Sequence, residues 1–329
     1  MQPLSVLMVG GTGKISSACV ARAIERGFDV SVLNRKQTSI RPVPKAVTRL
    51  TADISDAEAT RKALGDRQFD AVVHFMLFDP ARVGQDMDLF KDRTGQFIFI
   101  SSASAYQKPV LRLPITESTP LANPYWDYSR RKIACEERLL SAYREHGFPV
   151  TIVRPSHTYD RTGLPFNGGW TVVERMRMGK PVVVHGDGTS LWVLTHHDDF
   201  ARAFVWLLAN PLAIGDTFHI TSDELLTWDQ IHRLVAHTAG VAEPRLVHVS
   251  SETIAKVLPD WGPGLIGDKA HSVIFDNSKI RRLAPGWVAK IPFAEGARQI
   301  VDWFDAQPGR RAIDEKVDHA FDVLAEQYS

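Results

Sequence analysis

The chain is poor in cysteine, with only Cys19 and Cys135 among its 329 residues. Both fall inside helical hydrophobic patterns, so the sequence supports neither a disulfide framework nor a thiolate metal site. Among the histidines, the closest group is His196 and His197, followed by two aspartates. Because adjacent side chains are expected to point to different faces where a strand meets a helix, we predict a helix cap here and no metal site.

The chain also lacks an excess of charge of either sign and any long hydrophobic run. Its 39 basic and 38 acidic residues leave a net charge of +1, which provides no electrostatic footprint for nucleic acid or an anionic membrane. Its apolar runs are far shorter than the roughly 20 residues of a membrane span, and its start shows no secretory signal pattern. These absences predict a cytoplasmic protein with no membrane or nucleic-acid partner.

Short, continuous apolar runs alternate with helical patterns over the first half of the chain. Such runs are typical of parallel strands buried between two layers of helices. They predict an α/β fold: a Rossmann-like doubly wound parallel sheet in residues 1–160, with a smaller α/β substrate lobe in residues 161–329, partly interleaved with the sheet. The predicted strands are 4–9, 30–33, 47–50, 71–75, 97–100 and 150–153; the predicted helices are 12–26, 170–179, 198–209, 227–239, 293–306 and 310–329.

A glycine-rich turn follows the first predicted strand, with the spacing G-x-x-G-x-x-S from Gly10 to Ser16. A Cβ at Gly10 or Gly13 would obstruct the close approach of backbone N–H groups to a pyrophosphate. A helix starting at Thr12 would aim its positive end at the phosphates. We therefore predict a dinucleotide site, whose candidate residues are Gly10, Thr12, Gly13, Lys14, Ile15, Asn34, Arg35, Asp53, Ile54, Tyr128, Lys132 and Pro155.

The end of the second predicted strand indicates which coenzyme is bound. An acidic residue at this place binds the ribose 2′-hydroxyl of NAD, whereas an arginine accommodates the 2′-phosphate of NADP. Here the sequence is Asn34-Arg35-Lys36, so we predict NADP in preference to NAD. The alternatives for Arg35 are stacking on adenine or facing solvent. Asp53 is placed either to accept a hydrogen bond from the adenine amino group or to cap the helix that begins near Ser55.

Tyr128 and Lys132 stand one helical turn apart and so share a face of a predicted helix. A lysine ammonium held close to a tyrosine favours the phenolate, which would let Tyr128 exchange a proton with a substrate hydroxyl near neutral pH. Ser102, which ends the fifth predicted strand, would donate a hydrogen bond to the substrate oxygen. Ordinary turn chemistry is the alternative for Ser102 and for Ser104. The pattern predicts redox chemistry at a hydroxyl or carbonyl.

These motifs resemble the extended short-chain dehydrogenase/reductase family, whose members include nucleotide-sugar epimerases and dehydratases. The resemblance covers nearly the whole chain, and it implies an NAD(P)-dependent, epimerase/dehydratase-like enzyme of carbohydrate metabolism. It also implies that Ser102, Tyr128 and Lys132 form the catalytic triad, with Lys132 holding the nicotinamide ribose. The residues that carry it are the Gly10 turn, Asp53, Phe99 to Ser102, Ala105-Tyr106, Tyr128, Lys132, Arg154-Pro155, Gly186 to Gly188 and His196 to Asp199.

The chain departs from the family pattern around the expected substrate. Ala103 and Ser104 stand where dehydratases of the family place an acidic pair, which argues against sugar 4,6-dehydration. Trp192 and Leu265 stand where two arginines would clamp a substrate diphosphate. The loss of two charge-assisted contacts would cost several kcal/mol of diphosphate affinity. Trp192 offers instead a flat apolar face to a ring, with core packing as the alternative.

The leading hypothesis is therefore an NAD(P)-dependent oxidoreductase or epimerase acting at a secondary hydroxyl or carbonyl of a sugar or sugar-like substrate without a diphosphate. A nucleotide-sugar epimerase with a rebuilt diphosphate site is the first alternative. The candidate substrate contacts, each with ordinary packing as its alternative, are Ser104, Tyr106, His157, Trp170, Trp192 and His196.

The alternative from another class is a non-catalytic coenzyme-fold protein that binds nucleic acid. The segment near 80–92 is shorter than the helical segment with which the family forms dimers. This shortening resembles an atypical branch of the family that includes chloroplast stem-loop-binding proteins. A basic run that includes Arg35, Arg41 and Arg49 would be the footprint, but no aromatic residues are interleaved with it. The shortening leaves either a monomer or a homodimer.

Overall fold

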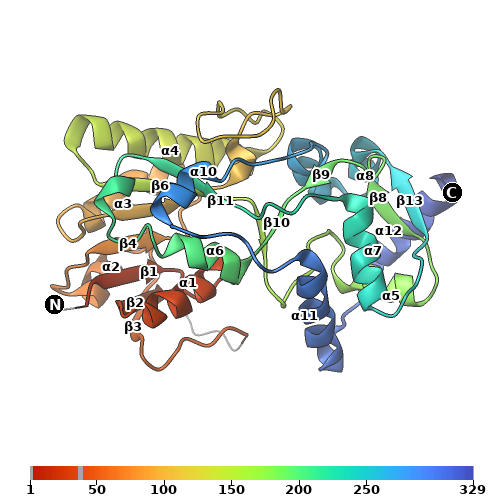
Figure 1. Cartoon of the computed structure of the whole chain (residues 1–329), viewed down its shortest axis with the longest axis horizontal. Coiled ribbons are helices and arrows are strands. Elements are labelled where there is room, and N and C mark those ends of the chain that lie inside the picture. Colours follow the sequence, from red (N-terminus) through yellow and green to blue (C-terminus); the bar gives the residue numbers. More distant parts are fainter. Residues whose placement is uncertain (1–2, 36–39, 329) are drawn as a thin grey trace.

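The computed structural model describes residues 3–35 and 40–328, and its largest element is a seven-stranded sheet. All neighbouring strands pair in parallel, in the order β11-β6-β5-β4-β1-β2-β3 (Figure 1). The strands are β1 (Ser5–Val9), β2 (Asp29–Asn34), β3 (Thr48–Thr51), β4 (Ala71–His74), β5 (Phe97–Ile100), β6 (Val150–Pro155) and β11 (Thr217–Ile220).

Helices cover both faces of this sheet. Alternate residues of β1 point to opposite faces, so that Val6 and Met8 join one hydrophobic cluster while Leu7 and Val9 join another. The first cluster includes side chains of α1 (Lys14–Glu25), α6 (His197–Phe204) and α10 (Ser278–Leu283); the second includes side chains of α2 (Ala57–Leu64), α3 (Val83–Phe90) and α4 (Asp127–His146). Burial on both faces explains the continuous apolar runs, and the predicted α/β fold is confirmed.

The second lobe lies beside the sheet, toward the C-terminus in Figure 1, and has no large sheet of its own. Three two-stranded pairs and several helices enclose a core rich in aromatic residues, among them Trp170, Trp192 and Trp228. The strand pairs are β7 (His157–Tyr159) with β10 (Leu194–His196), β9 (Leu191–Trp192) with β12 (Leu226–Thr227), and β8 (Val182–His185) with β13 (Leu246–Val249). The helices are α5 (Trp170–Arg177), α7 (Trp228–Thr238), α8 (Ser251–Val257), α9 (Gly262–Gly264), α11 (Phe293–Asp305) and α12 (Glu315–Tyr328), with a π-helical turn, η5 (Leu265–Lys269).

The chain passes between the two lobes more than once. It leaves the sheet after β6, builds β7 to β10, and returns as α6, which packs against α1, and as β11, which pairs with β6. It leaves again for β12 to α9 and returns with α10.

Several elements begin or end a few residues from their predicted positions, each for a local reason. Helix α1 begins at Lys14 and not at Thr12, because Gly13 is its N-cap. Strand β4 ends at His74, whose Nδ1 accepts a hydrogen bond from the Met76 amide at 3.1 Å and turns the chain. Helix α6 ends at Phe204, five residues before Ala209, which has a φ of +50°.

Candidate active site

The glycine turn after β1 is built for close packing. Gly10 has a φ of +85°, and a Cβ there would lie 2.5 Å from Cγ of Met76. The Ser16 hydroxyl accepts a hydrogen bond from the Gly13 amide and donates one to the Gly10 carbonyl, both at 2.7 Å. Ser16 thereby ties the first turn of α1 to the end of β1. The bare backbone at the start of a 12-residue helix fits a dinucleotide pyrophosphate, since no side chain at Gly10 or Gly13 fills the space.

The other predicted residues of the turn lie around this cradle. Thr12 and Ile15 are half-buried, and Lys14 is exposed at the start of α1. The Lys14 side chain reaches toward the second lobe, because a Cβ on Gly163 would lie 2.8 Å from Nζ. The Lys14 carbonyl accepts a hydrogen bond from Nδ1 of His197 at 2.9 Å, which fixes the cradle against α6.

The residues predicted to select the coenzyme follow β2 and β3, the two strands next to β1 on one side of the sheet. Arg35 is exposed, with Nη1 3.7 Å from Oδ2 of Asp53. The Asp53 carboxylate also accepts hydrogen bonds from the amide and hydroxyl of Ser55, which lower its pKa. The cap of α2 is Asp56 and not Asp53, so that alternative for Asp53 is wrong. Asn34 is half-buried and Ile54 is buried beside these residues, whereas Lys36 lies outside the described residues.

Lys132 is buried at the carboxyl ends of β4 and β5. Its Nζ donates hydrogen bonds to the carbonyls of Leu77 and Ile100, both at 2.8 Å, and lies 5.9 Å from the ring centroid of Tyr128. Burial lowers the pKa of Lys132 to about 7. The ammonium is thus held by the backbone and is aimed at two carbonyls.

Tyr128 lies in the first turn of α4, one turn before Lys132. Burial raises the pKa of Tyr128, while a hydrogen bond with Ser102 lowers it in part. The prediction that the lysine ammonium holds down the pKa of Tyr128 is therefore wrong for this geometry, because burial outweighs every other influence on the phenol. A protonated phenol is suited to donate a proton to a substrate oxygen.

A row of three serine hydroxyls orients Ser102. The hydroxyl of Ser129 donates to Oγ of Ser104 at 2.8 Å, and the hydroxyls of Ser104 and Ser102 lie 2.9 Å apart. With Ser104 donating to Ser102, the Ser102 proton is free to point at Tyr128 or at a substrate. Asn123 holds this row by donating to the Ser104 carbonyl at 2.9 Å. Ser129 and Asn123 are supporting residues that sequence reasoning missed.

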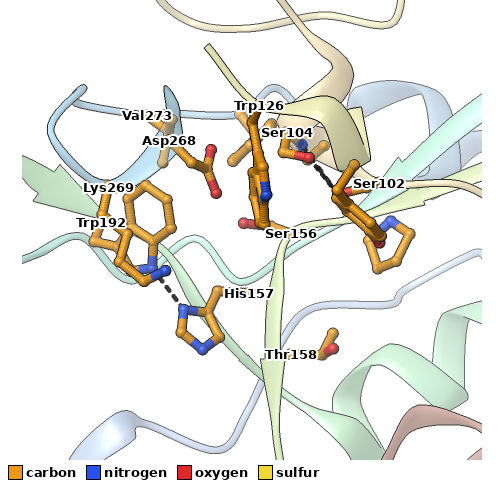
Figure 2. Close-up of a pocket in the computed structure, with 14 residues that line it drawn as sticks. Ser102, Ser104, Trp126, Ser156, His157, Thr158, Trp192, Asp268, Lys269 and Val273 are labelled. Carbon is orange, nitrogen blue, oxygen red and sulfur yellow. Dashed lines mark hydrogen bonds between the residues drawn. The ribbon is translucent and has the colours of Figure 1, made fainter. Parts of the chain in front are cut away.

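A pocket of about 300 Å³ opens beside Ser102 and Tyr128 (Figure 2). In this view Trp192 and Lys269 lie on one side and Ser102 on the other, with Trp126 between them. Six of the predicted residues line the pocket: Ser102, Ser104, Tyr128, Pro155, His157 and Trp192. Sequence reasoning missed Ala103, Trp126, Ser156, Thr158, Asp268, Lys269, Val273 and Phe275.

Trp192 and His157 form one unit in the pocket wall. Nε1 of Trp192 donates to Nδ1 of His157 at 3.0 Å, and the Trp192 ring packs against Trp228 with centroids 5.3 Å apart. Burial lowers the pKa of His157 to about 3, so its imidazole is neutral at physiological pH. Trp192 therefore serves the core and the pocket wall together.

Three predicted substrate contacts lie away from this pocket. Trp170 stacks on Phe304 in the core of the second lobe, with ring centroids 4.8 Å apart. His196 is buried, and its Nε2 lies 3.1 Å from Oε1 of Gln299. Tyr106 is buried, and the structure places none of the three side chains on the pocket wall.

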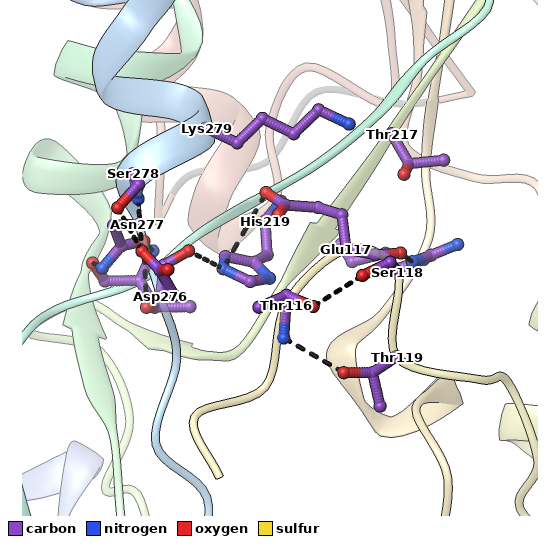
Figure 3. A network of polar contacts seen from close by, with 12 residues as sticks. Thr116, Glu117, Ser118, Thr119, Thr217, His219, Asp276, Asn277, Ser278 and Lys279 are labelled. Atoms are coloured by element: carbon purple, nitrogen blue, oxygen red, sulfur yellow. Dashed lines mark hydrogen bonds and ion pairs between the residues drawn. The ribbon is translucent and has the colours of Figure 1, made fainter. Parts of the chain in front are cut away.

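Tyr106 belongs to a buried polar network between the two lobes. Its hydroxyl lies 3.0 Å from Nδ1 of His219, and Nε2 of His219 donates to the Asp276 carbonyl at 2.8 Å (Figure 3). The His219 amide donates to the carboxylate of Glu117 at 3.2 Å. This network attaches the segment after Ser102 to β11 and to the loop before α10. It therefore stabilises the segment that carries Ser102 and Ser104 into the pocket wall.

His196, His197 and Asp198 can bring one ligand atom each within 4.8 Å of one another. The two imidazole rings lie 4.8 Å apart, so the expectation that they point to different faces is wrong. His196 is the N-cap of α6 and accepts from the Asp198 amide at 3.3 Å. Its second nitrogen faces Gln299 at 3.1 Å, so both imidazole nitrogens already have protein partners.

Two arginines of the basic run after β2 have partners within the protein, although Arg35, Lys45 and Arg49 are exposed. Nε of Arg41 pairs with Oδ2 of Asp160 at 2.7 Å, and Nη2 of Arg49 donates to the Val43 carbonyl at 2.8 Å. Arg41 thereby joins the segment after β2 to the second lobe. Arg41 and Arg49 therefore contribute to the structure of this segment.

The parallel sheet, the glycine turn and the Tyr128 pocket at its carboxyl edge define a dinucleotide-binding α/β enzyme. A family model described as the NAD dependent epimerase/dehydratase family matches residues 6–221. The chain belongs to this NAD-dependent family, and it is an enzyme of the extended short-chain dehydrogenase/reductase type.

Relatives of the chain differ in the activities for which they are named. The chain is 28% identical to 2′-dehydrokanamycin reductase of Streptomyces kanamyceticus over 86% of this chain and 80% of that protein. It is 25% identical to dTDP-glucose 4,6-dehydratase of Haemophilus influenzae over 92% and 98%. It is 23% identical to the chloroplast stem-loop binding protein of 41 kDa b of Arabidopsis thaliana over 97% and 83%.

Solved structures show the same fold. Epimerase Mth375 of Methanothermobacter thermautotrophicus superposes with a TM-score of 0.76 at 16% identity, covering 93% of each chain. UDP-glucose 4-epimerase of Thermotoga maritima, solved with UDP-glucose, has a TM-score of 0.70 at 22% identity, covering 92% of this chain and 99% of that chain. Among residues 3–35 and 40–328, we find no helix with the length and apolarity needed to span a membrane.

Proposed function

We propose that this enzyme is an NADP-dependent oxidoreductase acting at a secondary hydroxyl or carbonyl of a sugar or sugar-like molecule that has no diphosphate. The observation that carries the proposal is the convergence of Ser102 and Tyr128 on a pocket of about 300 Å³ at the carboxyl edge of the sheet. That volume is at the lower end for ligand pockets, which suits a single ring better than a nucleotide sugar. A cytoplasmic location stays a prediction from the sequence.

We assign Tyr128 as the proton donor when a carbonyl is reduced. Its raised pKa keeps the phenol protonated at neutral pH, and Ser102 is placed to donate a second hydrogen bond to the same substrate oxygen. Lys132, anchored on two backbone carbonyls, is placed to contact the coenzyme ribose. A coenzyme held there would supply a hydride for the carbonyl carbon, and the Tyr128 hydroxyl would donate its proton to the carbonyl oxygen.

The pocket wall supports a substrate other than a diphosphate. Trp192 occupies the place of one clamp arginine, and its indole N–H is already bonded to His157. Asp268 is the one carboxylate among the described residues that line the pocket, and Ala103 and Ser104 follow Ser102. This composition disfavours a dehydration that needs an acidic pair. The reductase relative is named for 2′-dehydrokanamycin, which is not a nucleotide sugar.

Tyr128→Phe tests the proton-transfer assignment. We expect turnover to fall about 10²- to 10⁴-fold, because the proton donor is lost while the ring stays in place. NADPH affinity should stay within about threefold of the wild-type value, since the glycine turn that faces the phosphates is unchanged. Tyr125→Phe is the matched control, because Tyr125 is exposed and does not line the pocket. Full activity of Tyr128→Phe would contradict the assignment.

The coenzyme preference is tested by analysing the ligand released from denatured protein and by titrating empty protein with NADPH and NADH. We expect an empty protein that binds NADPH more tightly, and we expect Arg35→Ser to weaken NADPH binding without changing NADH binding. Tightly retained NAD would favour instead a nucleotide-sugar epimerase, with a rebuilt diphosphate site, that recycles its coenzyme.

A further inference from the structure

The π-helical turn η5 holds Lys269 firmly at the substrate pocket. The Lys269 carbonyl accepts hydrogen bonds from Nε2 of His185, the hydroxyl of Ser190 and Nε1 of Trp228, each at 3.2 Å. All three donors lie outside the turn. Because π-helical turns are rare and concentrate at functional sites, a turn fixed by three side chains indicates a specific position for the Lys269 side chain.

The Lys269 ammonium lines the pocket and lies near Trp126. A Cβ on Gly264 would be 3.7 Å from Nζ of Lys269 and 3.9 Å from Cζ2 of Trp126. Within residues 3–35 and 40–328, no carboxylate oxygen lies within the 4.0 Å ion-pair distance of this ammonium. The neighbouring Asp268 carboxylate pairs at 3.3 Å with Nζ of Lys108, whose side chain is 1% exposed.

The other titratable groups around Lys269 do not supply a negative charge. His157 and His185 are buried with pKa values lowered to about 3 and about 4, so both are neutral at physiological pH. Burial also lowers the pKa of His271, and Tyr128 stays protonated. Burial lowers the pKa of Lys269, and the charge of Asp268 offsets this only in part. Because the Asp268 carboxylate pairs with Lys108, the Lys269 ammonium has no ion-pair partner among the described residues.

We propose that Lys269 binds an anionic group of the substrate, a carboxylate or a phosphate monoester, while Trp126 and Trp192 line the space for the ring. This inference rests on the proposed function and narrows its substrate to a sugar-like acid or monophosphate. A desolvated ammonium gains from a counter-anion, and the resulting charge-assisted hydrogen bond would orient the ring relative to Tyr128. One ammonium gives a single point contact, unlike the two arginines that clamp a diphosphate.

The test measures binding of small probes to the NADP-loaded protein by the rise in Tm, at constant ionic strength. The probes are acetate, its neutral analogue acetamide, and inorganic phosphate. The variants are Lys269→Gln and Lys269→Arg, with Lys256→Gln as the control, because Lys256 is exposed on α8 of the same lobe.

We expect acetate or phosphate, but not acetamide, to stabilise the wild type, Lys269→Arg and Lys256→Gln. In Lys269→Gln the apparent Kd for the effective anion should rise about 10-fold or more. A stronger effect of acetate would identify a carboxylate, and a stronger effect of phosphate would identify a monoester. Equal stabilisation of wild type and Lys269→Gln by the effective anion, or an effect of acetamide as large as that of the effective anion, would overturn the proposal, as would no stabilisation of the wild type by either anion. These binding measurements do not depend on turnover. A negative result would therefore reject the anion site alone, whereas full activity of Tyr128→Phe would reject the proton-transfer assignment.

Discussion

The two lobes of this enzyme position their functional side chains by different means. In the coenzyme lobe, Gly10, Ser102 and Pro155 follow or end strands of one parallel sheet, whose carboxyl ends meet at a single edge. In the substrate lobe, Lys269 and Trp192 are held by hydrogen bonds with residues distant in the sequence. Regular secondary structure therefore positions the glycine turn and the catalytic candidates, whereas long-range side-chain contacts shape the pocket wall.

The largest expected difference between the lobes concerns their buried arginines. In the coenzyme lobe Arg154 pairs at 2.5 Å with Glu136, and both side chains are at most 4% exposed. Arg154→Met should lower the free energy of unfolding by about 3–5 kcal/mol, because a buried carboxylate loses its partner. In the substrate lobe Arg175 pairs with Asp318 and Asp322, whose side chains are 30% and 45% exposed.

Arg175→Met should cost only about 1–2 kcal/mol, since water can solvate both carboxylates again. Chemical denaturation of the two variants beside the wild type measures the difference. Equal losses in the free energy of unfolding would show that the two lobes depend on their buried arginines to the same extent, which would contradict this expectation.

A second expected effect concerns the glycine turn. Gly10→Ala should weaken coenzyme binding more than about tenfold, because the new Cβ would collide with Met76 in addition to straining a positive φ. Gly27→Ala is the matched control, since Gly27 has a φ of +80° with nothing within 4 Å of its Cβ position. That control should cost about 1 kcal/mol of stability and leave coenzyme affinity unchanged. Titration with NADPH measures the coenzyme affinity of both variants, and chemical denaturation measures their stability. Equal NADPH affinities of Gly10→Ala and Gly27→Ala would show that Met76 moves aside.

A third expected effect is a pH dependence that differs between the lobes. Burial lowers the pKa of Lys132 from 10.5 to about 7, so the unfolded chain binds more protons between these values and stability rises with pH there. Burial lowers the pKa of His232 from 6.5 to about 4, so stability is lost as pH falls from 6.5 toward 4. Each slope is at most about 1.4 kcal/mol per pH unit.

Lys132→Met should therefore flatten the alkaline rise in the coenzyme-free protein, and His232→Gln should weaken the acid loss. Denaturation midpoints from pH 4 to pH 10 measure both slopes. An unchanged alkaline rise in Lys132→Met would mean that Lys132 is not the group that titrates.

The substrate contacts show where prediction from sequence is limited. His157 and Trp192 were expected at the substrate and do line the pocket, while Trp170 and Tyr106 were expected there and are core residues. The sequence contained no signal that separates these cases, because an aromatic residue in an apolar segment suits a core and a pocket wall equally. Asp268 and Lys269 reach the pocket only through a π-helical turn, which has no local sequence signature.

The order of strands and helices, the glycine turn after β1, and the helical spacing of Tyr128 and Lys132 follow from the sequence by itself. These features depend on hydrophobic periodicity and on residues close together in the chain. Only the tertiary structure decided that Lys132 faces the Leu77 and Ile100 carbonyls, and that Lys269 and Trp126 line the same pocket. Each of these arrangements depends on how segments far apart in the chain pack together, and the free energy of that packing is not encoded in any single segment.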